Sequence, residues 1–184
     1  MSNRLKIAIS GKSGCGNTTV SGIVADKLGL THINYTFHTM AKERGMSFEE
    51  FYELAQSDTS YDIILDRKQV ELARQGNCVL GSRLAIWVLE EADFKVYLEA
   101  SLETRAGRIA SREGGSLEEK IHETRRRDGK DRERYLRIYG IDNDSYGFAD
   151  LVVNVDSIDQ YEAADRIISA VLYKNPDFPY NPII

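Results

Sequence analysis

A glycine-rich segment near the N-terminus reads Gly11-Lys12-Ser13-Gly14-Cys15-Gly16-Asn17-Thr18-Thr19. It follows a short apolar run at residues 5–10 and precedes a helical pattern that begins near Thr18. The spacing matches the phosphate-binding loop, or P-loop, whose pattern is G-x-x-x-x-G-K-[ST], with Gly11, Gly16 and Thr18 in register. Asn17 stands where the pattern has a lysine that reaches the β- and γ-phosphates. The segment therefore predicts nucleotide binding and leaves open whether a phosphoryl group is transferred.

The nine residues 11–19 are all candidate nucleotide contacts, for a reason that lies in the backbone. Glycines let consecutive N–H groups face one anion, and the N-terminus of the following helix is positive at the same place. Thr18 provides a hydroxyl for Mg²⁺ bridging the terminal phosphates. Asn17 brings no charge, whereas Lys12 is close enough to turn its ammonium toward the same phosphates. The alternative is that Lys12 is a solvated loop residue.

Cys15 occupies the same loop near the start of a helix, a setting that lowers the pKa of a thiol. Its alternative role is that of a small residue that fills the loop. Cys78 is the second of only two cysteines, so the chain has no disulfide framework. A reducing cytoplasm is therefore the expected location.

Size and composition favour one domain spanning residues 1–184. Hydrophobic residues make up 42% of the chain and charged residues 29%, as in ordinary globular proteins. No apolar run approaches 18 residues and no basic-then-apolar leader is present, so we expect neither membrane insertion nor secretion. A net charge of −5 argues against general affinity for nucleic acid. The sequence does not distinguish a monomer from a dimer, and we expect a monomer.

Short apolar runs alternate with helical patterns along the whole chain. Strands are expected at residues 5–10, 31–35, 77–81, 94–99 and 151–155. Helices are expected at residues 18–28, 48–56, 61–74, 102–113 and 158–173, and a further long helix opens at Ser116. Ser47 with Glu50, and Ser116 with Glu119, read as capping boxes. This alternation predicts an α/β fold with a parallel sheet covered on both faces.

One segment departs from the acidic character of the chain. Residues 104–137 contain nine Arg and two Lys against seven Asp or Glu. Arg105, Arg108 and Arg112 are spaced to share one helix face, so they can converge on one anion. Arginine suits phosphate because its planar fork grips two oxygens at once. The alternative is a solvated helix with interspersed ion pairs.

Several stretches together resemble a known family. They are the P-loop, Met40-Ala-Lys-Glu-Arg-Gly-Met-Ser-Phe-Glu-Glu-Phe, Asp66-Arg-Lys-Gln, Leu80-Gly-Ser-Arg-Leu-Ala-Ile-Trp, Arg105-Ala-Gly-Arg-Ile-Ala-Ser-Arg-Glu-Gly and Glu133-Arg-Tyr-Leu-Arg-Ile-Tyr-Gly-Ile-Asp. From residue 6 to about 170 the chain resembles the archaeal-type cytidylate kinases of the nucleoside-monophosphate kinase group. The resemblance implies a three-layer P-loop kinase fold with a five-stranded parallel sheet. It also implies a monophosphate flap at about 36–75 and an arginine-rich lid at about 112–135.

The resemblance implies transfer of the γ-phosphoryl group of ATP to CMP or dCMP, with Mg²⁺. It places the arginine-rich segment in the lid, so Arg105, Arg108 and Arg132 are candidate catalytic residues for the donor phosphates. Lys12 of the P-loop is the fourth candidate catalytic residue. We interpret Tyr135 and Tyr139 as packing residues of the lid. If Lys12 replaces the missing charge, Lys12→Ala lowers activity by an order of magnitude or more.

The acceptor side rests on four residues. Arg83 follows a buried strand at its carboxyl end, where parallel sheets bind ligands, and the matching family arginine faces the acceptor phosphate. Asp66 and Arg67 are candidates for contact with the base or phosphate, or else form a local ion pair. Relatives carry Phe-Arg where this chain has Phe37-His38, in a loop about two residues shorter. His38 is thus a candidate phosphate ligand or a plain surface residue.

Two other functions remain open from the sequence. Loss of the P-loop lysine and of the acceptor arginine is what decay into a nucleotide-binding protein with weak or lost transfer would produce. A kinase for UMP or another small acceptor is the second alternative.

Overall fold

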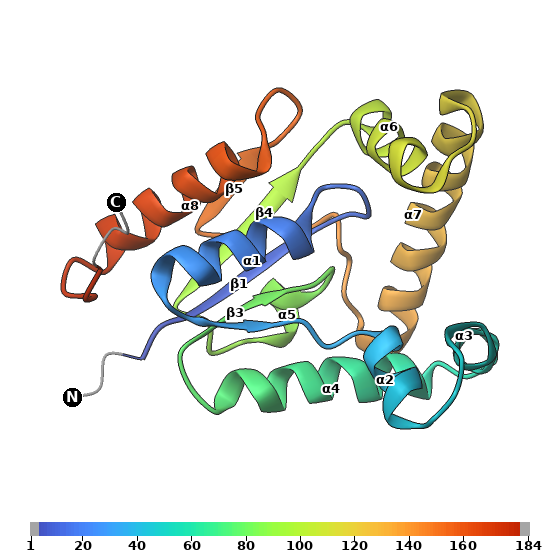
Figure 1. Cartoon of the computed structure of the whole chain (residues 1–184), viewed down its shortest axis with the longest axis horizontal. Helices are drawn as coiled ribbons and strands as arrows, with labels where there is room; N and C mark the ends of the chain where they lie inside the picture. The colour runs from blue at the N-terminus through green and yellow to red at the C-terminus, as the bar shows by residue number, and fades with distance from the viewer. Residues whose placement is uncertain (1–3, 181–184) are drawn as a thin grey trace.

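A computed structural model describes residues 4–180, apart from the side chain of Gln56. Five strands form one sheet in the order β2-β3-β1-β4-β5, and every neighbouring pair is parallel. The strands are β1 (Lys6–Gly11), β2 (Thr31–Ile33), β3 (Cys78–Gly81), β4 (Phe94–Glu99) and β5 (Leu151–Asn154). The predicted α/β fold with a five-stranded parallel sheet is confirmed (Figure 1).

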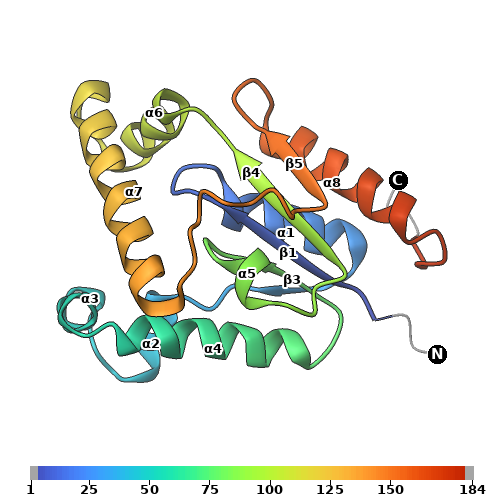
Figure 2. The same ribbon diagram turned by 180° about the vertical axis from the view of Figure 1, so that it is seen from behind.

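Helices cover both faces of this sheet, which makes three layers (Figures 1 and 2). α1 (Asn17–Leu28) and α8 (Gln160–Lys174) pack on one face, and α4 (Ser60–Arg74) and α5 (Ala85–Val88) lie on the other. Alternate side chains of β1 point to opposite faces of the sheet. Ile7 and Ile9 pack in the core under α1 and α8, whereas Ala8 packs in the core on the other face. All three side chains are fully buried, as expected of a central parallel strand.

Four more helices stand beyond the carboxyl ends of the strands (Figure 1). They are α2 (Phe37–Glu43), α3 (Phe48–Ser57), α6 (Leu102–Glu113) and α7 (Leu117–Tyr139). Both predicted capping boxes are present, because Ser47 caps α3 with Glu50 and Ser116 caps α7 with Glu119. Local sequence therefore determines where these helices begin.

The differences from the expected elements are small and have local causes. β2 ends at Ile33 rather than at residue 35, because the chain turns into α2, whose N-cap is Thr36. α8 begins at Gln160 rather than at 158, because the Asp159 side chain accepts hydrogen bonds from the first turn. α2 and α5 were not predicted, and with seven and four residues they are too short for a clear helical period.

Within residues 4–180, none of the helices combines the length and the apolar character that a bilayer span requires.

Candidate active site

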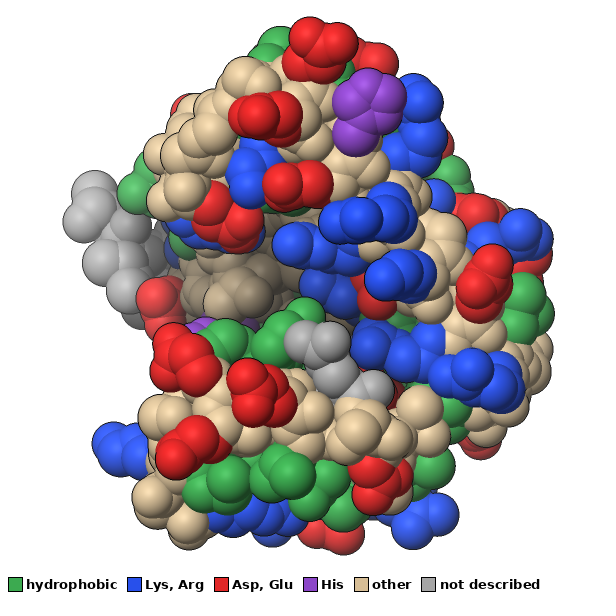
Figure 3. All heavy atoms as spheres, turned by 90° about the vertical axis from the view of Figure 1, so that its right-hand side faces the viewer, with side chains coloured by type: hydrophobic (Ala, Val, Ile, Leu, Met, Phe, Trp, Pro, Cys, Tyr) green, Lys and Arg blue, Asp and Glu red, His purple; other side chains and the backbone are tan. Residues whose placement is uncertain are grey.

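A large cleft of about 1060 Å³ opens beyond the carboxyl ends of the strands. The P-loop forms its floor, α2 to α4 contribute one wall, and α6, α7 and the segment before α8 contribute the rest. Figure 3 shows Lys and Arg side chains gathered along one side of this hollow. The arginines that line the cleft are Arg83, Arg108, Arg112, Arg127 and Arg134. A site with so many guanidinium groups is suited to a polyanion.

The P-loop has the backbone that the motif requires. Gly14 and Gly16 have φ values of +89° and +94°, in the region that favours glycine. Residues 12–19 all line the cleft, and α1 begins at Asn17, so its positive end faces the same space. Gly11 lies behind the cleft, where a Cβ would come within 2.6 Å of the Leu98 carbonyl oxygen.

Asn17 is turned toward its own loop. Its amide nitrogen donates a hydrogen bond of 2.6 Å to the carbonyl oxygen of Gly11. This bond ties the start of the P-loop to the first turn of α1. The Asn17 side chain therefore closes the loop and adds no positive charge to the cleft.

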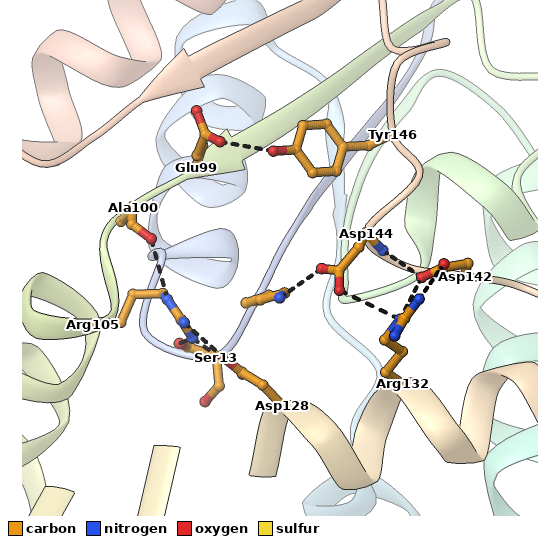
Figure 4. Close-up of polar contacts among 10 residues, drawn as sticks. Ser13, Glu99, Ala100, Arg105, Asp128, Arg132, Asp142, Asp144 and Tyr146 are labelled. Carbon is orange, nitrogen blue, oxygen red and sulfur yellow. Dashed lines mark hydrogen bonds and ion pairs between the residues drawn. The ribbon is translucent and has the colours of Figure 1, made fainter. Parts of the chain in front are cut away.

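Lys12 does not take the place of the missing lysine in this structure. Although Lys12 lines the cleft, its ammonium lies 2.6 Å from a carboxylate oxygen of Asp144. Asp144 also lies 3.4 Å from Arg132, as the close-up in Figure 4 shows. In this structure the Lys12 ammonium is thus paired with Asp144, and its contact with the donor phosphates stays a prediction.

Cys15 corrects a second expectation. The thiol is 2% exposed, and burial raises the pKa of Cys15 to about 11, although Arg105 and Arg108 partly oppose this. The expected lowering of its pKa is therefore wrong. Cys15 fills the loop, which was the alternative interpretation.

Arg105 is also placed differently from what its spacing suggested. It is 5% exposed and does not line the cleft. Its guanidinium donates hydrogen bonds of 3.1 and 2.7 Å to the carboxylate of Asp128, and others to the carbonyl oxygens of Ser13 and Ala100 (Figure 4). Arg105 thus joins α6, α7 and the P-loop, and each of its three side-chain nitrogens donates to a protein acceptor.

Arg132 is engaged outside the cleft as well. It donates two hydrogen bonds, of 2.8 and 2.7 Å, to Asp142, and the bond from Arg132 lowers the pKa of Asp142 to about 2. Of the predicted donor-phosphate arginines, only Arg108 lines the cleft. It donates to the carbonyl oxygens of Gly14 and Val155, at 3.4 and 2.6 Å.

Arg127 is a cation at the donor end that the sequence placed in the lid but did not single out as a phosphate contact. It comes from α7 and lines the cleft, and its Nη1 lies 3.4 Å from the Ser13 hydroxyl oxygen. Within residues 4–180 it makes no ion pair, although its charge helps to lower the pKa of Glu113. The available signal was its place in the arginine-rich segment, but nothing local separated it from Arg125 and Arg126, which are exposed.

Two arginines meet at the other end of the cleft. The Nη1 atom of Arg83 lies 2.5 Å from a carboxylate oxygen of Asp131, and the Arg83 side chain is 37% exposed. Arg134 lies 3.1 Å from the other oxygen of Asp131 and 3.5 Å from Asp62. The predicted candidate Arg83 is thus at the cleft, beside a second guanidinium whose partner carboxylates hold it in place.

The remaining predicted residues divide between cleft and surface. His38 lines the cleft with its ring stacked on that of Phe48, the centroids 3.7 Å apart. Asp66 lines the cleft and accepts a hydrogen bond of 2.5 Å from the Tyr139 hydroxyl. Arg67 is exposed and lies outside the cleft, so the structure does not place it with the others.

Burial dominates the electrostatics of Asp66. It raises the pKa of this carboxyl to about 6, while the Tyr139 hydrogen bond acts in the opposite direction. The Tyr139 hydroxyl therefore makes a polar contact with the cleft wall, where sequence reasoning assigned it to packing.

Comparison with known sequences identifies close relatives over most of the chain. The profile of the cytidylate kinase-like family matches residues 6–157. Cytidylate kinase 2 of Borrelia garinii subsp. bavariensis is 47% identical over 93% of this chain and 98% of its own length. The cytidylate kinase of Pyrococcus horikoshii is 42% identical over 83% of this chain and 80% of its own. The cytidylate kinase of Archaeoglobus fulgidus is 40% identical over 92% of this chain and 96% of its own length.

Solved structures share the fold at low sequence identity. Shikimate kinase from Acinetobacter baumannii, in complex with shikimate, superposes with a TM-score of 0.65 at 18% identity, over 93% of this chain and 94% of that one. Deoxyadenosine kinase from M. mycoides, with bound dATP, superposes with a TM-score of 0.54 at 20% identity, over 90% of this chain and 98% of that one. These likenesses establish a P-loop kinase fold.

Proposed function

The chain belongs to the cytidylate kinase-like family, and we propose that its cleft transfers the γ-phosphoryl group of ATP to CMP or dCMP. The observation that supports this most directly is the P-loop facing a cleft lined by five arginines. Phosphoryl transfer depends mainly on positioning and on cations that meet the spreading negative charge. The P-loop can position the donor phosphates, and the five arginines supply the cations.

At the donor end, we assign the phosphates of ATP to the N–H groups of residues 12–19 and the N-terminus of α1. Mg²⁺ held by the Thr18 hydroxyl would neutralise charge on the terminal phosphates. Arg127 and Arg108 supply the positive charge that Asn17 lacks, because both line the cleft beside Ser13 and Gly14.

At the acceptor end, we assign the phosphate of CMP to Arg83 and Arg134. Their shared partner Asp131 fixes both guanidinium groups at the cleft, so they can present donors to one anion. His38 lies in the same wall and can add a hydrogen bond. The attacking atom is a phosphate oxygen that is already ionised near neutral pH, so no general base is required.

Arg105 and Arg132 have positioning roles in this proposal. Arg105 holds the P-loop through the carbonyl oxygen of Ser13. Arg132 fixes the segment 142–144, whose Asp144 pairs with Lys12. Residues 36–75 would act as the monophosphate flap and residues 112–135 as the lid. Their closure would exclude water, which otherwise would compete for the γ-phosphoryl group.

An assay of four acceptors tests the proposal. Purified protein with Mg-ATP is given CMP, dCMP, UMP or AMP, and the release of ADP is followed. Turnover with CMP and dCMP well above that with UMP and AMP is expected. Binding of ATP without turnover on any acceptor would instead support a nucleotide-binding protein. Preferential turnover of UMP would identify a kinase of different specificity.

A further inference from the structure

The wall of the cleft formed by α4 carries two hydrogen-bond acceptors. Asp66 and Gln69 are three residues apart and thus share one face of α4. Both line the cleft. We refer to these two residues as the α4 acceptor pair.

The orientation of Gln69 is fixed by chemistry. Its side-chain nitrogen donates a hydrogen bond of 2.8 Å to the carbonyl oxygen of Tyr35. Because a carbonyl can only accept, the amide oxygen of Gln69 must point the other way. Gln69 is 4% exposed, and this oxygen has no partner within residues 4–180. A buried acceptor without a partner is costly, so a bound donor is the simplest explanation for its retention.

The orientation of Asp66 is fixed by a different contact. The Tyr139 hydroxyl occupies one carboxylate oxygen, at 2.5 Å, and leaves the other free to accept. Tyr139 comes from the last turn of α7, so it is a positioning residue that holds Asp66 of α4 from a different helix. Near neutral pH, Asp66 with a pKa of about 6 is mostly ionised and acts as an acceptor.

We propose that the α4 acceptor pair recognises the 4-amino group of the pyrimidine and thereby selects cytosine over uracil. This inference rests on the proposed function. An amino group has two hydrogens and can donate to two acceptors at once. Two acceptors each about 2.9 Å from one nitrogen lie about 5 Å apart, which is the spacing of neighbours on one helix face. Uracil has an oxygen at this position, and its lone pairs would face the pair of acceptors.

Two variants test this selection through a ratio. Asp66→Asn and Gln69→Leu are assayed for kcat/KM with CMP and with UMP. We expect the CMP-to-UMP ratio to fall about tenfold to a hundredfold in each, the size of one hydrogen bond to a charged or buried group. General damage to the fold lowers both activities and leaves the ratio unchanged. Gln75→Leu is the matched control, because Gln75 is exposed at the end of the same helix.

A ligand-side experiment keeps the test decisive if the variants fold poorly. The wild-type protein is assayed with the ribonucleotide of 2-pyrimidinone, which carries hydrogen in place of the amino group. We expect its kcat/KM to be about tenfold or more below that of CMP. We expect a much smaller difference between the two substrates in Asp66→Asn and Gln69→Leu.

The outcomes separate this inference from the proposed function. If the wild-type protein phosphorylates none of the nucleotides, the proposed function fails. If it phosphorylates CMP selectively but both variants keep the CMP-to-UMP ratio, only the α4 acceptor pair is excluded. Equal use of CMP and the 2-pyrimidinone nucleotide by the wild-type protein would likewise overturn the inference.

Discussion

Removal of the Arg105 side chain tests whether this residue is structural or contacts substrate. Its guanidinium is buried and donates to Asp128, Ser13 and Ala100. Arg105→Ala leaves the Asp128 carboxylate, 15% exposed, without its partner and uncovers two carbonyl oxygens. Breaking a buried ion pair by removing one partner costs about 3–5 kcal/mol. For a chain of this size, each kcal/mol shifts Tm by about 2–4 °C, so we expect Tm to fall by roughly 6–20 °C.

Urea unfolding followed by the fluorescence of Trp87, the single tryptophan, measures this free energy. The double variant Arg105→Ala/Asp128→Ala should lose less stability than the sum of the single variants, because it leaves no unpaired charge. Arg112→Ala is the control on the same helix, since this arginine is 64% exposed and should change stability by less than about 0.5 kcal/mol. An Arg105→Ala protein with wild-type stability and lost activity would refute the structural role and indicate that Arg105 contacts the donor phosphates.

Three further predictions follow from the charges at the cleft. Arg127→Ala should lower kcat by about a hundredfold or more, as expected for one preorganised charge, whereas Arg126→Ala should not; equal effects would remove Arg127 from the site. Lys12→Ala should change kcat by less than about threefold, because Asp144 already pairs with this ammonium; a tenfold loss in steady-state assays would show that Lys12 reaches the phosphates. The pKa of Asp66 is raised in the folded protein, so its contribution to stability is present below about pH 4 and is lost as pH rises through about 6. Asp66→Asn should therefore gain on the order of 2 kcal/mol relative to wild type between pH 4 and pH 7.5 in urea unfolding, and a pH-independent difference would contradict this.

The sequence predicted the features that depend on local pattern. Neighbouring residues alone indicate the glycines of the P-loop, the alternation of strands and helices, and the caps at Ser47 and Ser116. The α/β fold could therefore be predicted from the sequence. The spacing of Arg105 and Arg108 correctly placed them on one helix, but only tertiary partners decide which guanidinium turns inward. Arg105 is held by Asp128 and by Ser13, which is 92 residues away.

The same limit applies to the acceptor side. Arg83 was predictable because the carboxyl end of a parallel strand is a general ligand position. The roles of Arg134 and Gln69 depend on Asp62 of α4 and on the Tyr35 carbonyl, which come from other elements. No local period or motif indicates such pairings.

Gly81, at the end of β3, has a consequence for the metal that accompanies the nucleotide. A Cβ there would come within 2.1 Å of the Ser21 hydroxyl oxygen, so the strand end touches α1 directly. No carboxylate side chain fits at this position without pushing α1 away from the sheet. A divalent ion near Thr18 would therefore receive no carboxylate ligand from this strand end, and magnesium, which gives up its hydration shell reluctantly, would suit such a position.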